Sequence, residues 1–315
     1  MSLSNIKIGI SSCLLGENVR FDGQHKKNSF ITSVLKDYFE FRSFCPEVAI
    51  GLGIPREPIR LVSVDGEIRC RGTRNEDLDV THELQQTARK QRDWQHDLCG
   101  YILKKDSPSC GMERVKVYGG KMSTRSGVGV YASELLTNFP SLPVEEEGRM
   151  KDAHIRENFI RRVYVYSRWK DMCNGDLTIA KLQKFHASHK FILMSHNQSQ
   201  TRELGAMLSE KRMDKLQDLA DRYLTKSMLV LKKIASRKNH VNTLQHIQGY
   251  LKESLDASDK AELVEIIENY KNGLVPLIVP ITLLRHHFRR SPNKYITESY
   301  YMSPHPGELM LLNNI

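Results

Sequence analysis

The chain changes its hydrophobic pattern near residue 150, and this change constrains the fold more than any other feature of the sequence. Short apolar runs in the first half, such as "IKIGI", "YFEFRSF" and "LCGYIL", alternate with amphipathic stretches at 79–97 and 129–138. Two further runs flank Asp65-Gly66 in "IRLVSVDGEIRCRG", a pattern that indicates a hairpin. Alternation of strands and helices is typical of parallel α/β domains. We therefore expect a Rossmann-like α/β domain with a mostly parallel sheet.

The second half has helical periodicity almost throughout. Helices are expected over "LTIAKLQKFHASHKFILMSH", over a long run at 201–237, at 242–254, over "DKAELVEIIENYKN" with Ser258 as its N-cap, and from about Pro280 onward. The stretch "NFPSLPVEEEGRM", rich in proline and charge, is interpreted as the approach to a domain boundary. The predicted organisation is an α/β domain at 1–158 followed by an all-α domain at 159–315.

Composition places the chain among soluble globular proteins. Hydrophobic residues make up 40% of the 315 and charged residues 27%, and no apolar stretch approaches the roughly 18 residues of a membrane span. The N-terminus lacks a secretory pattern, so we expect a cytoplasmic protein with reduced thiols and no membrane helix. The six cysteines are then packing residues, metal ligands or nucleophiles rather than a disulfide framework. No obligate protein partner is inferred.

The positive charge is concentrated in the second half. Residues 1–160 hold 23 basic and 22 acidic side chains, whereas residues 161–315 hold 24 and 15. An excess of this kind suggests a surface for a polyanion, most often nucleic acid. A basic surface that only aids solubility is the alternative.

Three cysteines each follow a predicted strand. Cys13 lies in "ISSCLLG", Cys45 in "FCPEV" and Cys110 in "SPSCG". Loops at the carboxyl ends of parallel strands converge on one edge of a sheet. Three converging thiolates could hold a metal ion or an iron–sulfur cluster with one coordination position left for substrate. Buried packing residues are the other reading of such scattered cysteines.

At these motifs the chain resembles the thiouracil desulfurase (TudS-like) family. The resemblance is carried by "SSCLLGENVRFDG", "CPEVAIGLGIPREPIRL" and "KDSPSCG". The second half is similar to the YbgA-type domain found fused to it, through "FHASHKFILMSHN" with "RELG", and through "LVPLIVPITLLRHHF" with "SPHPGELML". The two resemblances together cover nearly the whole chain.

The resemblance implies a [4Fe-4S] cluster held by Cys13, Cys45 and Cys110, with one iron open to the sulfur of a thiocarbonyl. The implied reaction is a non-redox hydrolysis that releases hydrogen sulfide. Glu47 matches the acid/base position of the family, and Ser107 matches the catalytic serine. Three more residues lie in matching motifs and are either substrate contacts or loop-stabilising groups: Ser12, Arg20 and Asp22.

The fused form also resembles proteins that remove 4-thiouridine from transfer RNA, and the basic second half favours such a partner. The expected RNA contacts combine cations with aromatic faces: Arg285, His286, His287, Arg289, Arg290 and Lys294, with Tyr295, Tyr300 and Tyr301. A charged helix end beside core tyrosines is the alternative. His186, His189 and His196 share a helical spacing that suggests a metal site or a polar, phosphate-facing stripe.

Two other functions stay open at this point. One is a desulfidase that acts only on free thiouracil or thiouridine. The other is a non-catalytic RNA-binding protein in which the cysteines hold a structural metal.

Overall fold

The computed structural model describes residues 6–119, 122–209, 216–309 and 311–313. The chain forms two compact units, which we call unit 1 (Met1–Lys151) and unit 2 (Asp152–Ile315). The boundary expected after residue 158 lies inside helix α6 (Ala153–Cys173). Asp152 is the N-cap of this helix, and its side chain accepts hydrogen bonds from the backbone N–H groups of His154 and Ile155. Because the cap starts the helix at Ala153, the whole of α6 belongs to unit 2.

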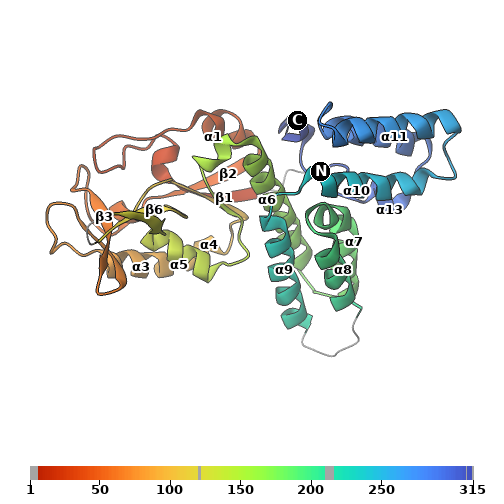
Figure 1. The fold of residues 1–315 in the computed structure, drawn as a ribbon. Coiled ribbons are helices and arrows are strands. Elements are labelled where there is room, and N and C mark those ends of the chain that lie inside the picture. Colours follow the sequence, from red (N-terminus) through yellow and green to blue (C-terminus); the bar gives the residue numbers. More distant parts are fainter. Residues whose placement is uncertain (1–5, 120–121, 210–215, 310, 314–315) are drawn as a thin grey trace. The chain divides into compact units, whose positions relative to one another are not determined.

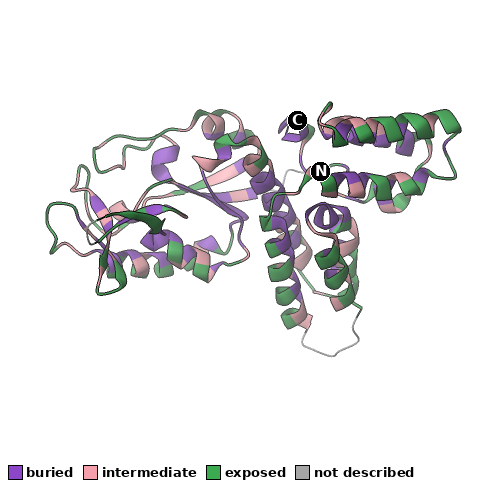
Figure 2. Ribbon diagram, in the orientation of Figure 1, coloured by how far each residue is buried: buried purple, intermediate pink, exposed green. Residues whose placement is uncertain are grey.

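The first sheet of unit 1 is parallel. It contains β1 (Ile6–Ser11), β2 (Phe39–Phe44), β5 (Gly100–Leu103) and β8 (Val144–Glu146) in the order β2-β1-β5-β8. Every neighbouring pair is parallel. The central strands are deeply buried (Figure 2), with Ile8, Ile10 and Ile102 fully inaccessible. Burial on both faces is the reason that these strands read as continuous apolar runs.

The second sheet of unit 1 has the order β4-β3-β6-β7 and is mixed. Its strands are β3 (Ile59–Val64), β4 (Glu67–Gly72), β6 (Val115–Tyr118) and β7 (Thr124–Gly127). The β3–β4 hairpin turns at Asp65 and Gly66, whose φ angles are 52° and 86°. Positive φ at both central residues matches the twist of a two-residue hairpin, so the expected turn is confirmed.

Helices of unit 1 lie on two sides of its sheets in Figure 1, with α1 on one side and α3, α4 and α5 on the other. Their bounds are α1 (Ser29–Ser33), α2 (Pro46–Ala49), α3 (Thr81–Lys90), α4 (Arg92–Gln95) and α5 (Val130–Asn138), with 3-10 turns η1 (Ser12–Leu14), η2 (Leu35–Asp37) and η3 (Arg149–Lys151). The amphipathic stretch expected at 79–97 therefore divides at Gln91. The parallel-dominated sheet with flanking helices confirms the α/β class.

The described part of unit 2 is entirely helical, as expected. After α6 follow α7 (Ile179–His196), α8 (Gln198–Met207), α9 (Leu216–Lys232), α10 (Arg237–Gln248), α11 (Ala257–Lys271), α12 (Ile278–Arg290) and α13 (Lys294–Thr297), with 3-10 turns η4 (Gly249–Leu251), η5 (Gly307–Leu309) and η6 (Leu311–Asn313). An aromatic group lies in its core: Trp169 of α6 stacks on Tyr223 of α9 at 5.7 Å and meets Phe185 of α7 edge-on at 5.1 Å. These contacts tie three helices together.

Two details of the helical pattern differ from the sequence-based expectation. The run at 201–237 is not one helix, because α8 ends at Met207 and α9 begins at Leu216. This break brings Tyr223 back along α7, where its hydroxyl lies 2.9 Å from Nδ1 of His186. Asp256, not Ser258, caps α11 and accepts a hydrogen bond from the N–H of Asp259. Helix α12 begins at Ile278, near Pro280 as expected, and its first turn tolerates the proline.

Among the helices in the described ranges, none combines the length and apolar character that a membrane crossing requires.

Unit 2 should lose stability in mild acid because of its buried histidines. Burial lowers the pKa of His189 and His196 to about 3 and that of His186 and His305 to about 4, and it also lowers the pKa of His240. In the unfolded chain these rings protonate near pH 6.5. The unfolded state therefore binds more protons below about pH 6.5, and the free energy of unfolding falls by up to about 1.4 kcal/mol per pH unit for each histidine.

Urea unfolding of a Trp94→Phe variant, monitored by the remaining Trp169, reports on unit 2. The midpoint should be constant from pH 7 to 8.5 and should fall steeply between pH 6.5 and 5, above the range in which most carboxylates titrate. An unchanged midpoint at pH 5 would show that these histidines are charged in the folded protein.

Candidate active site

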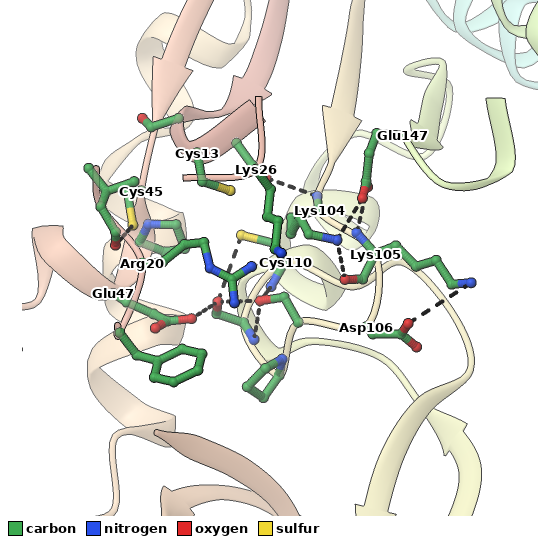
Figure 3. Close-up of a pocket in the computed structure, with 18 of the residues that line it drawn as sticks. Cys13, Arg20, Lys26, Cys45, Glu47, Lys104, Lys105, Asp106, Cys110 and Glu147 are labelled. Atoms are coloured by element: carbon green, nitrogen blue, oxygen red, sulfur yellow. Dashed lines mark hydrogen bonds and ion pairs between the residues drawn. The ribbon is translucent and has the colours of Figure 1, made fainter. Parts of the chain in front are cut away.

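A cavity of about 590 Å³ opens at the carboxyl ends of the parallel strands of unit 1 (Figure 3). Chain segments that follow β1, β2 and β5 line it. The chain passes from β1 to β2 on one side and later returns to β5 on the other side of β1. Such a reversal of strand order leaves a crevice above the strand ends, which is where open α/β sheets bind ligands.

Three cysteines project into this cavity from three adjacent strands. Cys13 lies in η1 directly after β1, Cys45 follows β2 as the N-cap of α2, and Cys110 lies in the loop after β5. All three line the cavity, and Figure 3 shows the sulfurs of Cys13 and Cys110 near each other and the Cys45 sulfur at one side, against the carbonyl of Val19. The structure thus brings together residues that are far apart in the sequence, as the strand-end argument predicts.

The environment of these thiols keeps them protonated when no cation is bound. Burial raises the pKa of Cys13 to about 11 and also raises the pKa values of Cys45 and Cys110. The nearby Cys45 sulfur further raises the pKa values of Cys13 and Cys110, and Glu47 further raises the pKa of Cys45. The Cys45 thiol donates to the carbonyl of Val19 at 3.8 Å, and Ser109 Oγ lies 3.7 Å from the Cys110 sulfur. Closely spaced buried thiols of this kind become strong ligands once a cation displaces their protons.

Glu47 of α2 is a cavity residue whose carboxylate is held on both oxygens. Arg56 donates from Nε and Nη2 to Oε2, at 2.9 and 2.7 Å, and Ser109 donates to Oε1 at 2.6 Å. The same guanidinium donates to the carbonyls of Gly53 and Val19. Arg56 therefore fixes Glu47 and the loop carrying Val19 in one arrangement.

Ser107 extends this arrangement into a directional chain of hydroxyl groups. Its Oγ lies 2.9 Å from Ser109 Oγ and accepts the backbone N–H of Cys110 at 3.0 Å. Because Ser109 donates its proton to Glu47, Ser107 is the donor in the contact between the two serines. The resulting path runs from Ser107 through Ser109 to Glu47. It also fixes the loop that carries Cys110.

Ser12 and Arg20 line the same cavity, whereas Asp22 does not. Asp22 accepts from the N–H of Gln24 at 3.1 Å and pairs with Arg20 Nε at 3.4 Å. Its contacts are those of a loop-stabilising group that orients Arg20. Lysines add further positive charge to the lining: Lys26, Lys27, Lys104 and Lys105.

Sequence reasoning missed three polar residues of this site. Arg56 follows Glu47 by nine positions in "CPEVAIGLGIPREP", and Ser109 directly precedes Cys110. Glu147 anchors the opposite wall, with Oε1 2.6 Å from Lys104 Nζ and Oε2 accepting the N–H of Lys105 at 2.7 Å. Adjacency to a candidate ligand could have singled out Ser109, whereas the roles of Arg56 and Glu147 depend on folding.

The other three cysteines do not line the cavity. Cys70 lies fully buried on β4, and Cys99 lies buried just before β5. Cys173 is the last residue of α6, in unit 2. These positions agree with the choice of ligand candidates.

Several of the expected RNA contacts in unit 2 have structural partners instead. Arg285 donates to the carbonyl of Met302 and to Ser303 Oγ. His287 is only 2% exposed, and Tyr301 is buried with its hydroxyl 2.9 Å from His240 Nδ1. The guanidinium of Arg168 lies 3.8 Å from the ring centre of Tyr300. The expected contacts that stay exposed are His286, Arg289, Arg290 and Lys294.

The three histidines of α7 do not converge. Nδ1 of His189 bonds to the carbonyl of Phe185 and that of His196 to the carbonyl of Lys233, and both rings are buried. His186 instead lines a second cavity. Among the described residues these three rings do not form a cluster of metal ligands. The metal interpretation of the histidine spacing is therefore wrong.

Comparison with known proteins assigns each unit separately. The model of the 2-thiouracil desulfurase family matches residues 8–147, and a family described as a protein of unknown function (DUF1722) matches residues 190–306. Uncharacterized protein YbgA of Escherichia coli is 26% identical over 151 residues, which cover 48% of this chain and 89% of YbgA. Uncharacterized protein YbbK of Bacillus subtilis is 32% identical over 127 residues, which cover 38% of this chain and 83% of YbbK.

A solved structure named [4Fe-4S]-dependent thiouracil desulfidase TudS is 31% identical, and the match covers 47% of this chain and 95% of that one with a TM-score of 0.37. Family membership rests on the family-model match and on the similarity to YbbK. Through unit 1, the chain belongs to the 2-thiouracil desulfurase family.

Proposed function

We propose that unit 1 is a hydrolytic, non-redox desulfidase that uses an iron–sulfur cluster, and that its substrate is 4-thiouridine in transfer RNA. One observation carries the proposal. Three cysteine thiols line the same cavity as the carboxylate of Glu47. Arg56 holds this carboxylate in place, and the hydroxyl groups of two serines connect it to the cavity. Family membership supplies the sulfur chemistry.

The residues of the cavity fit a [4Fe-4S] cluster bound by Cys13, Cys45 and Cys110. All three donors are thiols, the ligand type that such clusters require, and none is used in a disulfide. If Cys45 loses its proton on binding a metal, the carbonyl of Val19 still has a hydrogen-bond donor, because Arg56 Nη2 also donates to it at 2.9 Å. Cationic side chains in the lining offset the negative charge of three thiolates.

With Cys13, Cys45 and Cys110 as its three protein ligands, a bound cluster would supply an iron able to act as a Lewis acid toward the sulfur of a thiocarbonyl. The protein residues then handle protons and orientation. Replacement of C=S by C=O consumes one water molecule and releases hydrogen sulfide, so both protons of the water must leave the oxygen that becomes bonded to the ring carbon and must reach the departing sulfur.

The hydroxyl path from Ser107 through Ser109 to Glu47 is the route by which the protein moves a proton. A water molecule at Ser107 gives one proton to Ser107 Oγ. At the same time the hydroxyl proton of Ser107 moves to Ser109, and the hydroxyl proton of Ser109 moves to the Glu47 carboxylate. Arg20 and Ser12 line the same space and are placed to bind the carbonyl and ring nitrogen groups of a pyrimidine.

Sulfide release separates the possible substrates. The chain, reconstituted with iron and sulfide under anaerobic conditions, should release hydrogen sulfide from transfer RNA that contains 4-thiouridine and leave uridine in its place. Release from free thiouracil but not from the RNA would make the free base the substrate. Metal-loaded protein without the broad visible absorption of a cluster, and without sulfide release, would indicate a structural metal in an RNA-binding protein.

The exposed cations of unit 2 should contribute to RNA binding. Arg289 and Arg290 are exposed at the end of α12, so replacing both with alanine should weaken RNA binding and flatten its dependence on salt. The affinity of the unsubstituted chain should fall by orders of magnitude between about 50 and 200 mM salt if several phosphates are contacted. Filter binding at four salt concentrations measures both slopes.

Sulfide release from free 4-thiouracil serves as the control for that experiment and should be unaffected by the two substitutions. Equal salt slopes for the double variant and the unsubstituted chain would remove this end of α12 from the RNA-binding surface.

A further inference from the structure

A second cavity, of about 370 Å³, lies within unit 2 and has no part in the sulfur chemistry of unit 1. Residues of α7, α8, α10 and the turn η4 line it. Figure 1 labels the three helices. Its volume falls at the lower end of the range typical of small-molecule sites. Two sequence motifs that the desulfidase proposal leaves unused, "FHASHKFILMSHN" and "RELG", contribute to it.

One wall of this cavity is cationic. Lys190 on α7 and Arg202 on α8 line it, and both side chains are exposed. Neither forms an ion pair with any carboxylate in the described ranges, and no aspartate or glutamate is among the described residues that line the cavity. Two cations that line one cavity and have no carboxylate partner among the described residues favour an anionic ligand.

Two imidazoles lie on the same lining. His186 occurs one helical turn before Lys190, so the two side chains share a face of α7. Its Nδ1 is fixed 2.9 Å from the hydroxyl of Tyr223, and its Nε2 lies next to Gly205 of α8, where an added Cβ would come within 3.2 Å. The missing side chain at Gly205 leaves room for the ring. Nε2 of His246, on α10, accepts a hydrogen bond from the side-chain amide Nε2 of Gln198 at 3.4 Å.

The other wall of the cavity is aromatic. Tyr250, in η4, is 45% exposed even though its ring stacks on Tyr295 at 5.7 Å. Phe191 meets Tyr250 edge-on at 6.3 Å. Stacking partners of this kind orient an aromatic ring and leave a flat surface on which a planar ligand can lie.

From this pairing of a cationic wall and an aromatic wall, we infer that the cavity of unit 2 binds a nucleoside phosphate. Lys190 and Arg202 contact the phosphate, His186 and His246 donate further hydrogen bonds to it, and Tyr250 stacks on the base. The same chemistry is present in a free nucleoside monophosphate and in a nucleotide of an RNA chain. Binding here does not depend on the desulfidase proposal, although an RNA nucleotide in this cavity would link the two.

Calorimetric titration of the full chain with uridine 5′-monophosphate tests the inference. The nucleotide should bind at least about tenfold more tightly than either uridine or inorganic phosphate, because only the nucleotide occupies both walls. A nucleotide affinity no greater than that of inorganic phosphate would overturn the inference.

Substitutions on the cavity wall should separate its two parts. Lys190→Gln and Arg202→Gln should each weaken nucleotide binding by about tenfold to a hundredfold, as expected for loss of a charge-assisted contact. The matched control is Lys184→Gln, an exposed lysine of α7 that does not line the cavity. Tyr250→Ala should weaken binding about tenfold and Tyr250→Phe should restore it. Equal affinities for Lys190→Gln and Lys184→Gln would refute the site.

Competition identifies the source of the ligand. If uridine 5′-monophosphate displaces transfer RNA, and Lys190→Gln weakens the binding of the nucleotide and of the RNA, the cavity binds RNA. If neither the nucleotide nor the substitution affects RNA binding, the cavity binds a free nucleotide. Sulfide release from free 4-thiouracil, measured on the same variants, should be unchanged. Loss of nucleotide binding and loss of sulfide release therefore report separately on the two proposals.

Discussion

Replacing Cys13, Cys45 or Cys110 with alanine should remove the iron that the reconstituted chain binds and abolish sulfide release. Each of these thiols lies at the end of a different parallel strand and faces the same cavity, so each substitution leaves only two thiolates for the cluster. Iron and acid-labile sulfide per chain, together with the visible absorption of the cluster, measure the effect directly.

Cys70→Ala and Cys173→Ala are the controls, because both cysteines lie outside the cavity. Both variants should keep the iron content and activity of the unsubstituted chain. The ligand assignment would fail if all five variants bound the same amount of iron. Circular dichroism of each variant, recorded before reconstitution, distinguishes loss of a ligand from loss of the fold.

Glu47→Gln should retain iron and lower the rate of sulfide release by a factor of about 10² to 10⁴, the usual contribution of a positioned acid/base group. Glutamine keeps the shape of the side chain but cannot accept the proton that arrives through Ser109. Ser107→Ala and Ser109→Ala interrupt the same path and should lower the rate in the same direction. Single-turnover release from free 4-thiouracil isolates this step from RNA binding.

Glu134→Gln is a matched control, because Glu134 also accepts two hydrogen bonds from an arginine, Arg89, but lies on α5 outside the cavity. It should release sulfide at the original rate. If Glu47→Gln instead lost its iron, the contact between Glu47 and Arg56 would be a structural support of the site, and the proton path would have to end elsewhere.

The sequence alone was sufficient for properties that depend on neighbouring residues. Buried strands read as apolar runs, surface helices repeat every 3.6 residues, and Asp65-Gly66 specifies a hairpin, so the change from α/β to all-α could be predicted. The positions of Cys13, Cys45 and Cys110 at strand ends were also visible. Because carboxyl ends of parallel strands share one edge, their convergence followed from the fold class.

Tertiary structure decided which polar groups are buried and with what partners. Strand β8, in the stretch interpreted as a boundary, was not predicted because its sequence is Val144-Glu145-Glu146. Both glutamates are buried: Glu146 accepts the N–H of Met112 at 2.8 Å, and Glu145 pairs with Arg149 at 2.8 Å. Burial raises the pKa of Glu146 even so.

The expected RNA contacts and the cavity of unit 2 also show that burial and partners depend on tertiary structure. "RHHFRR" and the tyrosines that follow it resemble a basic, aromatic surface in sequence, yet His287 and Tyr301 are core residues. Lys190, Arg202 and Tyr250 line one cavity although α7, α8 and η4 are separated along the chain. Helical periodicity is set by local backbone geometry, whereas the partner of a polar side chain is set by contacts between distant segments, which only the folded chain establishes.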